Sequence, residues 1–513
     1  MKVKRVFIRS TLTLQTWATT IAAISLLVGV GTPPSYAQTT AGLELPVVEH
    51  RLANGMRFLV FPRPGAPTVS FVVQYSVGGV NELLGHTGTA HLLEHLLFKG
   101  TETLGTRNLD AERSLFIRMD ALQDSILALQ ASHRDTTSSP LMRARIRALE
   151  DEANVYVQPN EFSRVLSTNG ARGLNATTDW ESTKYVVEMP ANRVELWFLL
   201  ESDRMSNPVF RQFYTERDVV AEERLLRVDT QPGGLLFEAH VGAAFTVHPY
   251  RQPVVGYMSD ITRLRRQGVA EYYHRYYGAG NAIVAIVGDV VPEQIVTWAE
   301  EYFGHLPTGD PPPAVLTEEP AQRGERRVEV ILDAQPQVRI GWHVVEVSHQ
   351  DAPALRVLSA LLTGGRSSRL YRRLVMRDQI ATNVYSSLGP GSRFPGMFTI
   401  EATPRAPNTT RAIEAAVYAE LDALLHDPPS ETELQRIRNQ LEANGVRRLT
   451  SNMGLALQLA ESSSIFGDWR TTFELSGRLL NVGPGDVSRV VQIFFSRENR
   501  TVATLARSNS PTH

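Results

Sequence analysis

The sequence predicts an α+β fold in which mostly antiparallel sheets are packed by helices. Apolar strand-like runs alternate with long helical patterns over most of the 513 residues. A chain of this length is too long for one compact core, so two or more domains are expected. The Pro-rich segment 306–325 is the best candidate for a linker between them, although it could also be a rigid surface loop within one domain.

The composition is that of an ordinary globular protein and excludes some function classes. The chain is 42% hydrophobic and 21% charged, and its formal net charge is −2, which argues against a dedicated nucleic-acid-binding protein. It contains no cysteine, which excludes disulfides, thiolate metal ligands and cysteine nucleophiles. Any metal ion must therefore be held by nitrogen and oxygen ligands.

Residues 1–37 have the pattern of a secretory signal peptide. Lys2, Lys4, Arg5 and Arg9 precede an apolar stretch from about residue 17 to 30, and Ser35-Tyr36-Ala37 supplies a small-x-small cleavage site. The alternative is an uncleaved membrane anchor, but the apolar run is short and interrupted by polar residues. We expect a periplasmic or secreted protein with no stable membrane span after cleavage.

The first part of the mature chain predicts a strand pair followed by a helix. Asn54-Gly55 is a strong two-residue hairpin signal between apolar runs. Residues 69–77 form a further strand candidate, and the glycines around 78–88 interrupt the pattern before a helical segment begins.

That helical segment carries His91-Leu92-Leu93-Glu94-His95, which is the most informative motif of the chain. Positions i and i+4 share one face of a helix, so both imidazoles can reach one metal ion. Glu94 lies between them on the same side, where it could hold a water molecule. The order is that of the inverted zincin pattern. Two helix histidines can also fall at this spacing by chance, so the rest of the chain has to decide.

Later segments continue the alternation of helices and strands. Residues about 109–131 and 139–155 predict a helical hairpin, because apolar residues recur at helical spacing on both sides of a Thr-Thr-Ser-Ser-Pro break. Further expected helices are 191–206, 215–228, 352–362, 367–377 and 410–425, and further expected strands are 281–288, 328–332 and 338–344.

Together these motifs resemble the pitrilysin/insulinase family of metallopeptidases, which includes the mitochondrial processing peptidases. The resemblance begins at residues 52–103 and continues to Gly364–Leu370, so it covers nearly the whole mature chain. The segments that carry it are Leu52-Ala53-Asn54-Gly55, Gly85 to His95, Phe98-Lys99-Gly100-Thr101, Leu174-Asn175-Ala176-Thr177, Glu216 to Glu223, His248-Pro249-Tyr250 and Asn281 to Asp289.

The resemblance implies two homologous α+β domains and one Zn²⁺ per chain. We expect an N-terminal zinc-binding domain at 38–305, with the helical hairpin inserted at about 109–155, the linker at 306–325, and a C-terminal domain at 326–513. In the family the third zinc ligand is a glutamate seven residues after another glutamate on a later helix, a spacing that Glu216 and Glu223 match. Glu223 is therefore the expected third ligand beside His91 and His95, with its neighbour Glu222 as the alternative.

The same resemblance implies roles for the other residues of the site. Glu94 would act as the general base toward a zinc-activated water molecule, and Glu216 would orient or tune the metal site from behind its ligands. The segment Leu174, Asn175, Ala176 and Thr177 corresponds to the edge strand on which the family pairs its substrates. The alternative for that segment is the end of an ordinary interior strand. The helix face of Glu216 and Glu223 also carries Val219, Val220 and Leu226, and is expected to be buried.

Two features depart from the family pattern. The gap between His95 and Glu223 is longer than usual, which the helical hairpin explains. Active members also carry an arginine and a tyrosine in the C-terminal half of the molecule that help to hold substrate, and here Val375 and Thr382 stand at those positions. Arg377 and Tyr385 lie nearby but out of register by one residue. The chain thus resembles the zinc subunit of a split enzyme.

The leading hypothesis is a zinc-dependent endopeptidase, or the zinc-bearing subunit of a two-chain peptidase, acting on unfolded peptides. The expected partner is a homologous subunit without the zinc motif, or a second copy of this chain. The alternative is a catalytically silent scaffold or assembly protein of the same fold. A different zinc hydrolase that carries the motif by coincidence is a third hypothesis, which the motifs downstream disfavour.

Overall fold

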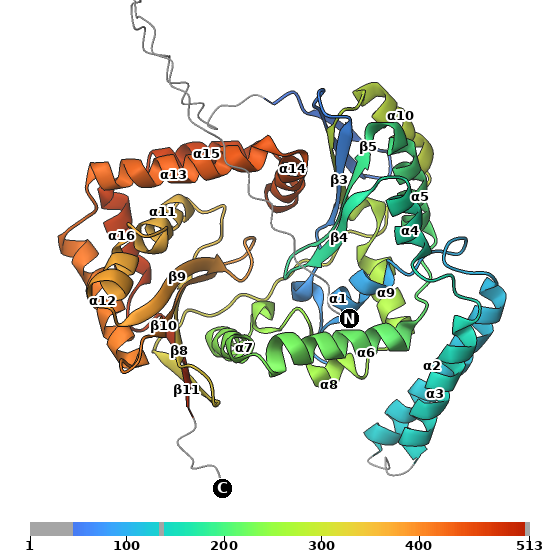
Figure 1. Ribbon diagram of the computed structural model, residues 1–513, viewed down its shortest axis with the longest axis horizontal. Helices are drawn as coiled ribbons and strands as arrows, with labels where there is room; N and C mark the ends of the chain where they lie inside the picture. Colours follow the sequence, from blue (N-terminus) through green and yellow to red (C-terminus); the bar gives the residue numbers. More distant parts are fainter. Residues whose placement is uncertain (1–44, 133–137, 508–513) are drawn as a thin grey trace, which may run out of the picture. The chain divides into compact units, whose positions relative to one another are not determined.

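The computed structural model describes residues 45–132 and 138–507, and Figure 1 shows the arrangement of their helices and strands. The predicted signal peptide at 1–37 lies outside the described residues. No helix among the described residues is long and apolar enough to cross a membrane.

The first sheet contains six strands in the order β1-β2-β6-β3-β5-β4. All neighbours are antiparallel except β2 and β6, which run parallel. The predicted hairpin is confirmed, with Asn54-Gly55 in the turn between β1 and β2, but the connection from Arg51 to Arg57 is longer than the two residues expected, and of the pair only Gly55 has a positive φ, 90°. Strand β4 is the last strand of the sheet, so one side of its backbone has no strand neighbour among the described residues. The strands are β1 Val48–Arg51, β2 Arg57–Pro62, β3 Thr68–Tyr75, β4 Arg172–Thr178, β5 Thr183–Pro190 and β6 Ala282–Gly288.

The second sheet repeats the strand order of the first. Its order is β7-β11-β8-β10-β9, which corresponds strand for strand to β2-β6-β3-β5-β4, and its only parallel pair, β7 with β11, corresponds to β2 with β6. Apart from β1, the two sheets thus have the same topology, and the predicted α+β fold with two mostly antiparallel sheets is confirmed. The strands are β7 Arg326–Ile331, β8 Gln337–Val344, β9 Ala381–Gly389, β10 Gly396–Pro404 and β11 Arg500–Ala506.

Helices of the first half pack mainly on one face of the first sheet and form its core. Phe71 of β3 stacks on Trp197 with ring centroids 4.3 Å apart, and Phe58, Phe198 and Phe303 complete an aromatic cluster. The helices are α1 Thr89–Leu96, α2 Leu109–Ala131, α3 Ser138–Asn154, α4 Glu161–Thr168, α5 Val194–Ser206, α6 Phe213–Arg224, α7 Pro232–Ala244, α8 Met258–Ile261, α9 Arg266–Tyr276 and α10 Pro292–Phe303, with short 3₁₀ segments at Gly79–Asn81, Ala191–Arg193, Pro249–Arg251 and Ala279–Asn281.

The second half has its own core, built around Trp342 and Phe398 on the second sheet. Side-chain caps define where several helices begin: Thr409, Ser430 and Ser451 each accept a hydrogen bond from a backbone amide of the first turn. The helices are α11 Ala352–Thr363, α12 Thr410–His426, α13 Glu431–Thr450, α14 Asn452–Phe466, α15 Thr471–Leu480 and α16 Pro484–Phe494.

Each half also lends one helix to the sheet of the other half. Helix α14 packs on β3 and β6 of the first sheet, where Leu455 and Leu459 join Val72 and Ala285 in an apolar cluster. Helix α7 packs in turn on β7, β8 and β11 of the second sheet. This exchange buries a second face of each sheet, and it was not foreseen from the sequence.

The predicted helical hairpin is confirmed as α2 and α3, which lie side by side (Figure 1). Its base is fixed by a fully buried ion pair, in which Arg211 Nε donates to Glu112 of α2 at 3.1 Å. The same guanidinium donates to the carbonyls of Lys99, Thr101 and Leu104. The Lys99-Gly100-Thr101 motif is therefore a loop wrapped around one arginine.

Two expected helices differ from the structure in type. The helix expected at 215–228 is α6, which continues as a π-helical turn at Leu225–Asp229, and the helix expected at 367–377 is a π-helix at Tyr371–Arg377. Apolar spacing alone does not separate these windings, because a π turn shifts the side-chain register only locally.

Candidate metal centre

The loop before α1 fixes the start of the helix. Gly85 and Gly88 both have φ near 90°, and a Cβ on Gly88 would lie 2.8 Å from the carbonyl oxygen of Val255. The buried carboxylate of Glu82 accepts hydrogen bonds from the amides of Gly88 at 2.9 Å and Ala90 at 2.6 Å. Burial raises the pKa of Glu82 to about 8, while these amides oppose the shift. Glu82 thereby holds the first turn of α1 in place through backbone N–H groups that have no partner within the helix.

His91 and His95 lie one turn apart on α1, with ring centroids 4.9 Å apart. His91 is 9% exposed, and its Nδ1 has no hydrogen-bond partner among the described residues. Burial, together with smaller contributions from the charges of His95 and Arg227, lowers the pKa of His91 to about 3. A neutral imidazole with a free lone pair is the form that binds a metal ion.

Helix α6 brings Glu223 to the two imidazoles. Its Oε1 lies 3.6 Å from His91 Nε2, and its Oε2 lies 3.5 Å from His95 Nε2. One ligand atom from each of the three residues lies within 4.8 Å of the other two. Glu222 points to solvent and is not part of this group. In this arrangement Arg227 also contacts Glu223, with Nη1 2.6 Å from Oε1.

The expectation of a wholly buried face on α6 was wrong. Val220 is fully buried, but Val219 and Leu226 are among the exposed apolar side chains. Leu226 belongs to the π-helical turn, which changes its angular position relative to α6. The buried face of α6 is therefore narrower than the sequence suggested, and Glu223 lies at the edge of this buried face.

Glu216 lies behind the three candidate ligands. Its Oε2 is 3.5 Å from His95 Nδ1, on the opposite side of that ring from Glu223, and its Oε1 is 2.6 Å from Lys99 Nζ. Although burial opposes it, hydrogen bonds and charge from His95 and Lys99 keep the pKa of Glu216 below its ordinary value. Burial by itself would lower the pKa of His95. The nearby carboxylates of Glu216, Glu223 and Glu94 outweigh burial, so the pKa of His95 lies above its ordinary value. An ionised carboxylate on the rear nitrogen of a histidine orients that ring.

Glu94 lies beside this group but is not one of its three members. It is 9% exposed, and the hydroxyl of Thr178 donates to its Oε2 at 2.6 Å. Burial raises the pKa of Glu94, and the Thr178 hydrogen bond partly opposes the rise. The hydrogen bond from Thr178 to Glu94 was not predicted from the sequence, although Thr178 directly follows the segment 174–177 in the chain.

The segment Leu174–Thr177 lies on β4, the edge strand of the first sheet. Leu174 and Ala176 pack toward the core on the α1 side, whereas Asn175 and Thr177 pair with Val186 and Lys184 on the other face. Because β4 ends at Thr178, its free edge leads directly to Glu94.

The turn after β4 is fastened to the second half of the chain. Glu181 is buried and accepts hydrogen bonds from the Tyr250 hydroxyl and from the amides of Ser392 at 2.9 Å and Arg393 at 2.8 Å. A Cβ on Gly391 would lie 2.5 Å from Glu181 Oε1 and closer still to the Tyr250 hydroxyl. The His248-Pro249-Tyr250 motif therefore has a structural role in this junction.

Val375 and Thr382, which stand where the family has its arginine and tyrosine, make only contacts within the second half of the chain. Thr382 donates to the carbonyl of Thr403 at 3.3 Å, and Val375 packs against the second core. Arg377 pairs with its neighbour Asp378 at 2.8 Å, and Tyr385 is half-exposed on β9.

Two helix histidines, a glutamate from a second helix and a further carboxylate beside them thus lie together, on an α+β fold with two similar sheets, as the inverted zincin pattern would require. The family described as "Peptidase M16 inactive domain" matches residues 263–441, a range that begins after Glu223. This match agrees with the resemblance of the chain to the pitrilysin/insulinase family of metallopeptidases.

Relatives and solved structures agree with this assignment. The chain is 26% identical to the zinc protease PqqE of Helicobacter pylori over 88% of this chain and 91% of the relative. It is 22% identical to a probable mitochondrial-processing peptidase subunit beta of Arabidopsis thaliana, over 88% and 77%. The crystal structure of a protease from Helicobacter pylori superposes with a TM-score of 0.76 at 25% identity, covering 90% of this chain and all of that chain.

A larger solved structure shares the fold only. The periplasmic protease PqqL from Escherichia coli superposes with a TM-score of 0.65 at 16% identity, and the match covers 90% of this chain but 47% of that chain. This chain thus corresponds in fold to about half of that structure.

Proposed function

We propose that this chain is a zinc-dependent endopeptidase, or the zinc-bearing subunit of a two-chain peptidase, that cleaves unfolded peptides. The observation that carries the proposal is the convergence of His91, His95 and Glu223, with the carboxylate of Glu94 beside them but outside the ligand group. Relatives named as zinc proteases support the same chemistry.

The donor set fits a single Zn²⁺ ion. Two imidazole nitrogens and one carboxylate oxygen are a common ligand set of catalytic zinc sites, and they leave one position open. When bound there, zinc would supply a Lewis acid that polarises the scissile carbonyl and acidifies a water molecule. His91 and His95 would hold the ion as neutral imidazoles, with Glu216 keeping the His95 ring in place.

Glu94 is the proposed general base. Its burial raises its pKa, which makes it a better proton acceptor than an exposed glutamate, and the Thr178 hydroxyl keeps one of its oxygens in a fixed position. Glu94 would take the proton of the attacking water molecule and then pass it to the amine that leaves.

The free edge of β4 is the proposed place for the substrate. An extended peptide could add to the sheet through backbone hydrogen bonds with Leu174, Asn175, Ala176 and Thr177. Such pairing requires an unfolded chain and depends little on side chains. The scissile bond would then lie near Glu94, because Thr178 ends the same strand.

We further propose that the chain works with a homologous partner, either a subunit without the zinc motif or a second copy of itself. The proposal is supported by the match to about half of a longer protease and by the absence of the arginine and tyrosine from their usual positions, 375 and 382. Full peptidase activity from the pure, monomeric chain would contradict it.

The remaining expectations are also proposals. Residues 38–305 and 326–513 are the proposed domains, with 306–325 as the linker, and no helix or strand occurs between Phe303 and Arg326. The basic, apolar and small-residue pattern of 1–37 supports export to the periplasm or beyond. The description of the matched family as an inactive domain favours a silent scaffold as the second candidate, but that match covers only 263–441.

The decisive experiment compares Glu94→Gln with Glu222→Gln. We expect Glu94→Gln to retain bound zinc but to lose at least about a hundredfold in the cleavage of a quenched fluorescent peptide. Glu222→Gln, which changes an exposed carboxylate one residue from Glu223, should keep both zinc and turnover. Turnover that survives in zinc-loaded Glu94→Gln would sink the assignment of the base, and a wild-type chain that binds no zinc would favour the scaffold.

A further inference from the structure

Two buried tyrosines near Glu94 have hydroxyls that the proposed reaction does not use. Tyr185 of β5 and Tyr277, which directly follows α9, are each 5% exposed. Among the described residues neither hydroxyl has a hydrogen-bond partner of good geometry. A phenylalanine at either position would fill nearly the same space without burying an unpaired hydroxyl, which costs free energy. Each of the two hydroxyls therefore requires a partner.

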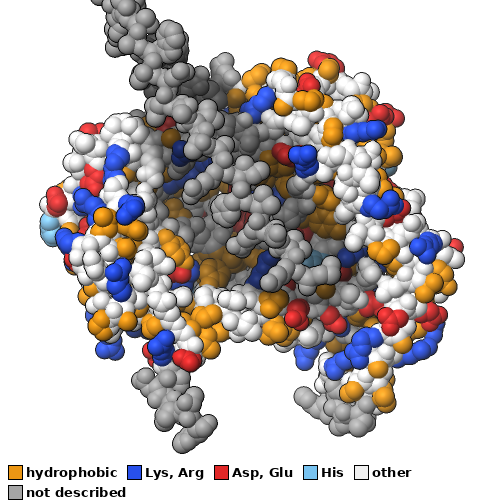
Figure 2. Space-filling model, in the orientation of Figure 1, with side chains coloured by type: hydrophobic (Ala, Val, Ile, Leu, Met, Phe, Trp, Pro, Cys, Tyr) orange, Lys and Arg blue, Asp and Glu red, His pale blue; other side chains and the backbone are white. Residues whose placement is uncertain are grey.

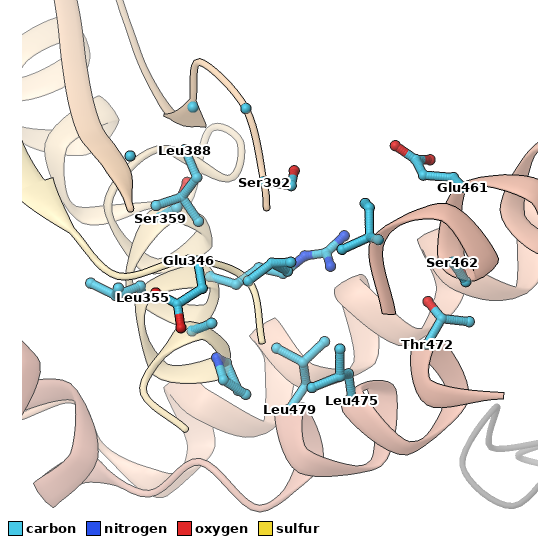
Figure 3. A pocket seen from close by; sticks show the side chains of 18 of the residues that line it. Glu346, Leu355, Ser359, Leu388, Ser392, Glu461, Ser462, Thr472, Leu475 and Leu479 are labelled. Carbon is cyan, nitrogen blue, oxygen red and sulfur yellow. The ribbon is translucent and has the colours of Figure 1, made fainter. Parts of the chain in front are cut away.

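The space around these tyrosines leaves little room for water as that partner. The gap that Tyr185 lines measures about 10 Å³, which is at the lower limit for a single water molecule. A cavity of about 470 Å³ in the second half of the chain is different, because Ser359, Ser392 and Thr472 surround open space there (Figure 3). Those hydroxyls can be hydrated, whereas the buried tyrosine hydroxyls depend on neighbouring side chains.

The neighbouring side chains lead to Glu94. Thr178 and Thr183 are partners across the β4–β5 pair, and their Oγ1 atoms are 3.5 Å apart. Burial raises the pKa of Tyr277 to about 12, and the adjacent side chains of Thr183 and Tyr185 oppose the rise. Thr178 in turn donates to Glu94 Oε2 at 2.6 Å. These four side chains form a hydroxyl cluster behind Glu94: Thr178, Thr183, Tyr185 and Tyr277.

Charges at its two ends orient the hydroxyl cluster. Arg204 lies over the ring of Tyr185, with Cζ 4.0 Å from the centroid, and pairs with Glu201 in the core. Burial is the main cause of the raised pKa of Tyr185 and Tyr277; the charge of Glu94 adds to the rise, and the charge of Arg204 opposes it. The hydroxyls therefore lie in a field that turns their oxygens toward the guanidinium and their protons toward the carboxylate.

Thr183 connects the tyrosines to Thr178. Its Oγ1 is buried and has two acceptors in reach, the carbonyl of Val77 at 3.1 Å and Thr178 Oγ1 at 3.5 Å. Its own lone pairs are free to accept the proton of Tyr277. Because Thr178 donates its only proton to Glu94, its oxygen becomes a stronger acceptor for Thr183. Each donor from Tyr277 onward thus points one step closer to Glu94.

We infer that Tyr277 and Thr183 are positioning residues for Glu94, that they act through the Thr178 hydroxyl, and that Tyr185 supports Tyr277. A peptide can enter the hollow on the face of the molecule that Figure 2 shows, but Thr183 and both tyrosines are buried and do not reach that surface. They hold the carboxylate in one place and direction and do not contact the substrate. The inference rests on the proposed function for the role of Glu94 as the base.

The test compares kcat and KM of zinc-loaded, full-length variants on a quenched fluorescent peptide. Tyr277→Phe deletes one buried oxygen, and we expect kcat to fall about threefold to tenfold. Thr178→Val removes the donor to Glu94 and should lower kcat about tenfold to a hundredfold, whereas Thr178→Ser keeps the hydroxyl and should retain most of the activity. KM should stay within about twofold throughout, because the lost interactions act on the base.

Tyr273→Phe is the matched control. Tyr273 is also a buried tyrosine of α9, but its hydroxyl donates to the carbonyl of Met205 at 2.6 Å, outside the hydroxyl cluster. This variant should leave kcat unchanged even where it loses stability. In the double variant Thr178→Val/Tyr277→Phe, kcat should be no lower than in Thr178→Val alone, because Tyr277 acts through Thr178. A melting curve and a zinc analysis check that every variant is folded and loaded.

Native kcat in Tyr277→Phe, an equal loss in Tyr273→Phe, or losses that multiply in the double variant would overturn the inference. Crystal structures of the native, Thr178→Val and Tyr277→Phe chains give a second readout that needs no turnover. The carboxylate of Glu94 should have a single orientation in the native chain and several in the variants, and a single unchanged orientation in both variants would also count against the inference. A zinc-loaded native chain that cleaves no peptide rejects the peptidase alone, since the crystal structures still test the positioning.

Discussion

Replacing Gly391 by alanine should destabilise the junction between the β4–β5 turn and the second half of the chain. The added Cβ would lie 2.5 Å from Glu181 Oε1 and even closer to the Tyr250 hydroxyl. Neither group can withdraw easily, because Glu181 is buried and also accepts the amides of Ser392 and Arg393.

The expected cost follows from two contributions. Overpacking a buried site by one carbon costs about 1–3 kcal/mol, and weakening one hydrogen bond to the Glu181 carboxylate costs about 1.5–3 kcal/mol, so a total near 3 kcal/mol is a conservative expectation. At about 2–4 °C per kcal/mol for a domain of this size, the melting temperature should fall by about 6–12 °C.

Gly268→Ala provides the matched control, because it is the same chemical change at a helical glycine of α9 with nothing within 4 Å of the added Cβ. Alanine is the better helix former, so this variant should gain about 0.5–1 kcal/mol and melt at a slightly higher temperature. Differential scanning calorimetry of the two variants measures both shifts. A Gly391→Ala protein that melts within 1 or 2 °C of the native chain, against the fall of about 6–12 °C expected here, would refute the reasoning.

Three further outcomes are expected. Between pH 4.5 and about 8, Glu82 is protonated in the folded chain but ionised in the unfolded chain. The free energy of unfolding should therefore fall by about 1.4 kcal/mol per pH unit as the pH rises. Glu82→Gln should remove this slope in denaturant titrations at several pH values. Glu216→Gln should weaken zinc binding by about tenfold to a hundredfold, measured with a competing chelator, because the ring behind the metal loses its orienting carboxylate. Glu112→Gln should cost about 3 kcal/mol in unfolding free energy, because it leaves the charge of Arg211 buried without a counter-ion.

Each of these outcomes has a result that would contradict it. An unchanged pH slope in Glu82→Gln would mean that other groups govern stability in that range. Unaltered zinc affinity in Glu216→Gln would leave this carboxylate with a packing role only. A Glu112→Gln chain as stable as the native one would show that the three backbone carbonyls suffice for Arg211.

Local sequence patterns were sufficient wherever neighbouring residues determine the outcome. The i,i+4 spacing of His91 and His95 puts both rings on one face of any helix that contains them. Asn54-Gly55 specifies its turn because only a few residues tolerate positive φ. The seven-residue spacing of Glu216 and Glu223 likewise places both on one side of α6. The different roles expected for the two glutamates came only from the family resemblance.

Only the tertiary structure could decide which distant residues meet. Glu223 reaches the two histidines because α6 packs beside α1, and the sequence favoured it over Glu222 only through the spacing from Glu216 that the family resemblance supplied. The exchange of α7 and α14 between the sheets depends on which faces remain uncovered after each half has folded.

The same limit applies to the buried charges. From their neighbours in the sequence, Glu181 and Arg211 would be expected to be exposed to solvent. In the structure each is buried and bonded to groups remote in the sequence, Arg211 to backbone carbonyls and Glu181 to amides and a hydroxyl. The sequence alone therefore determined the type of fold and the chemistry available on single helices and turns. The assembly of that chemistry into a site required the packing of elements that lie far apart in the sequence, because burial and pairing are properties of the folded chain.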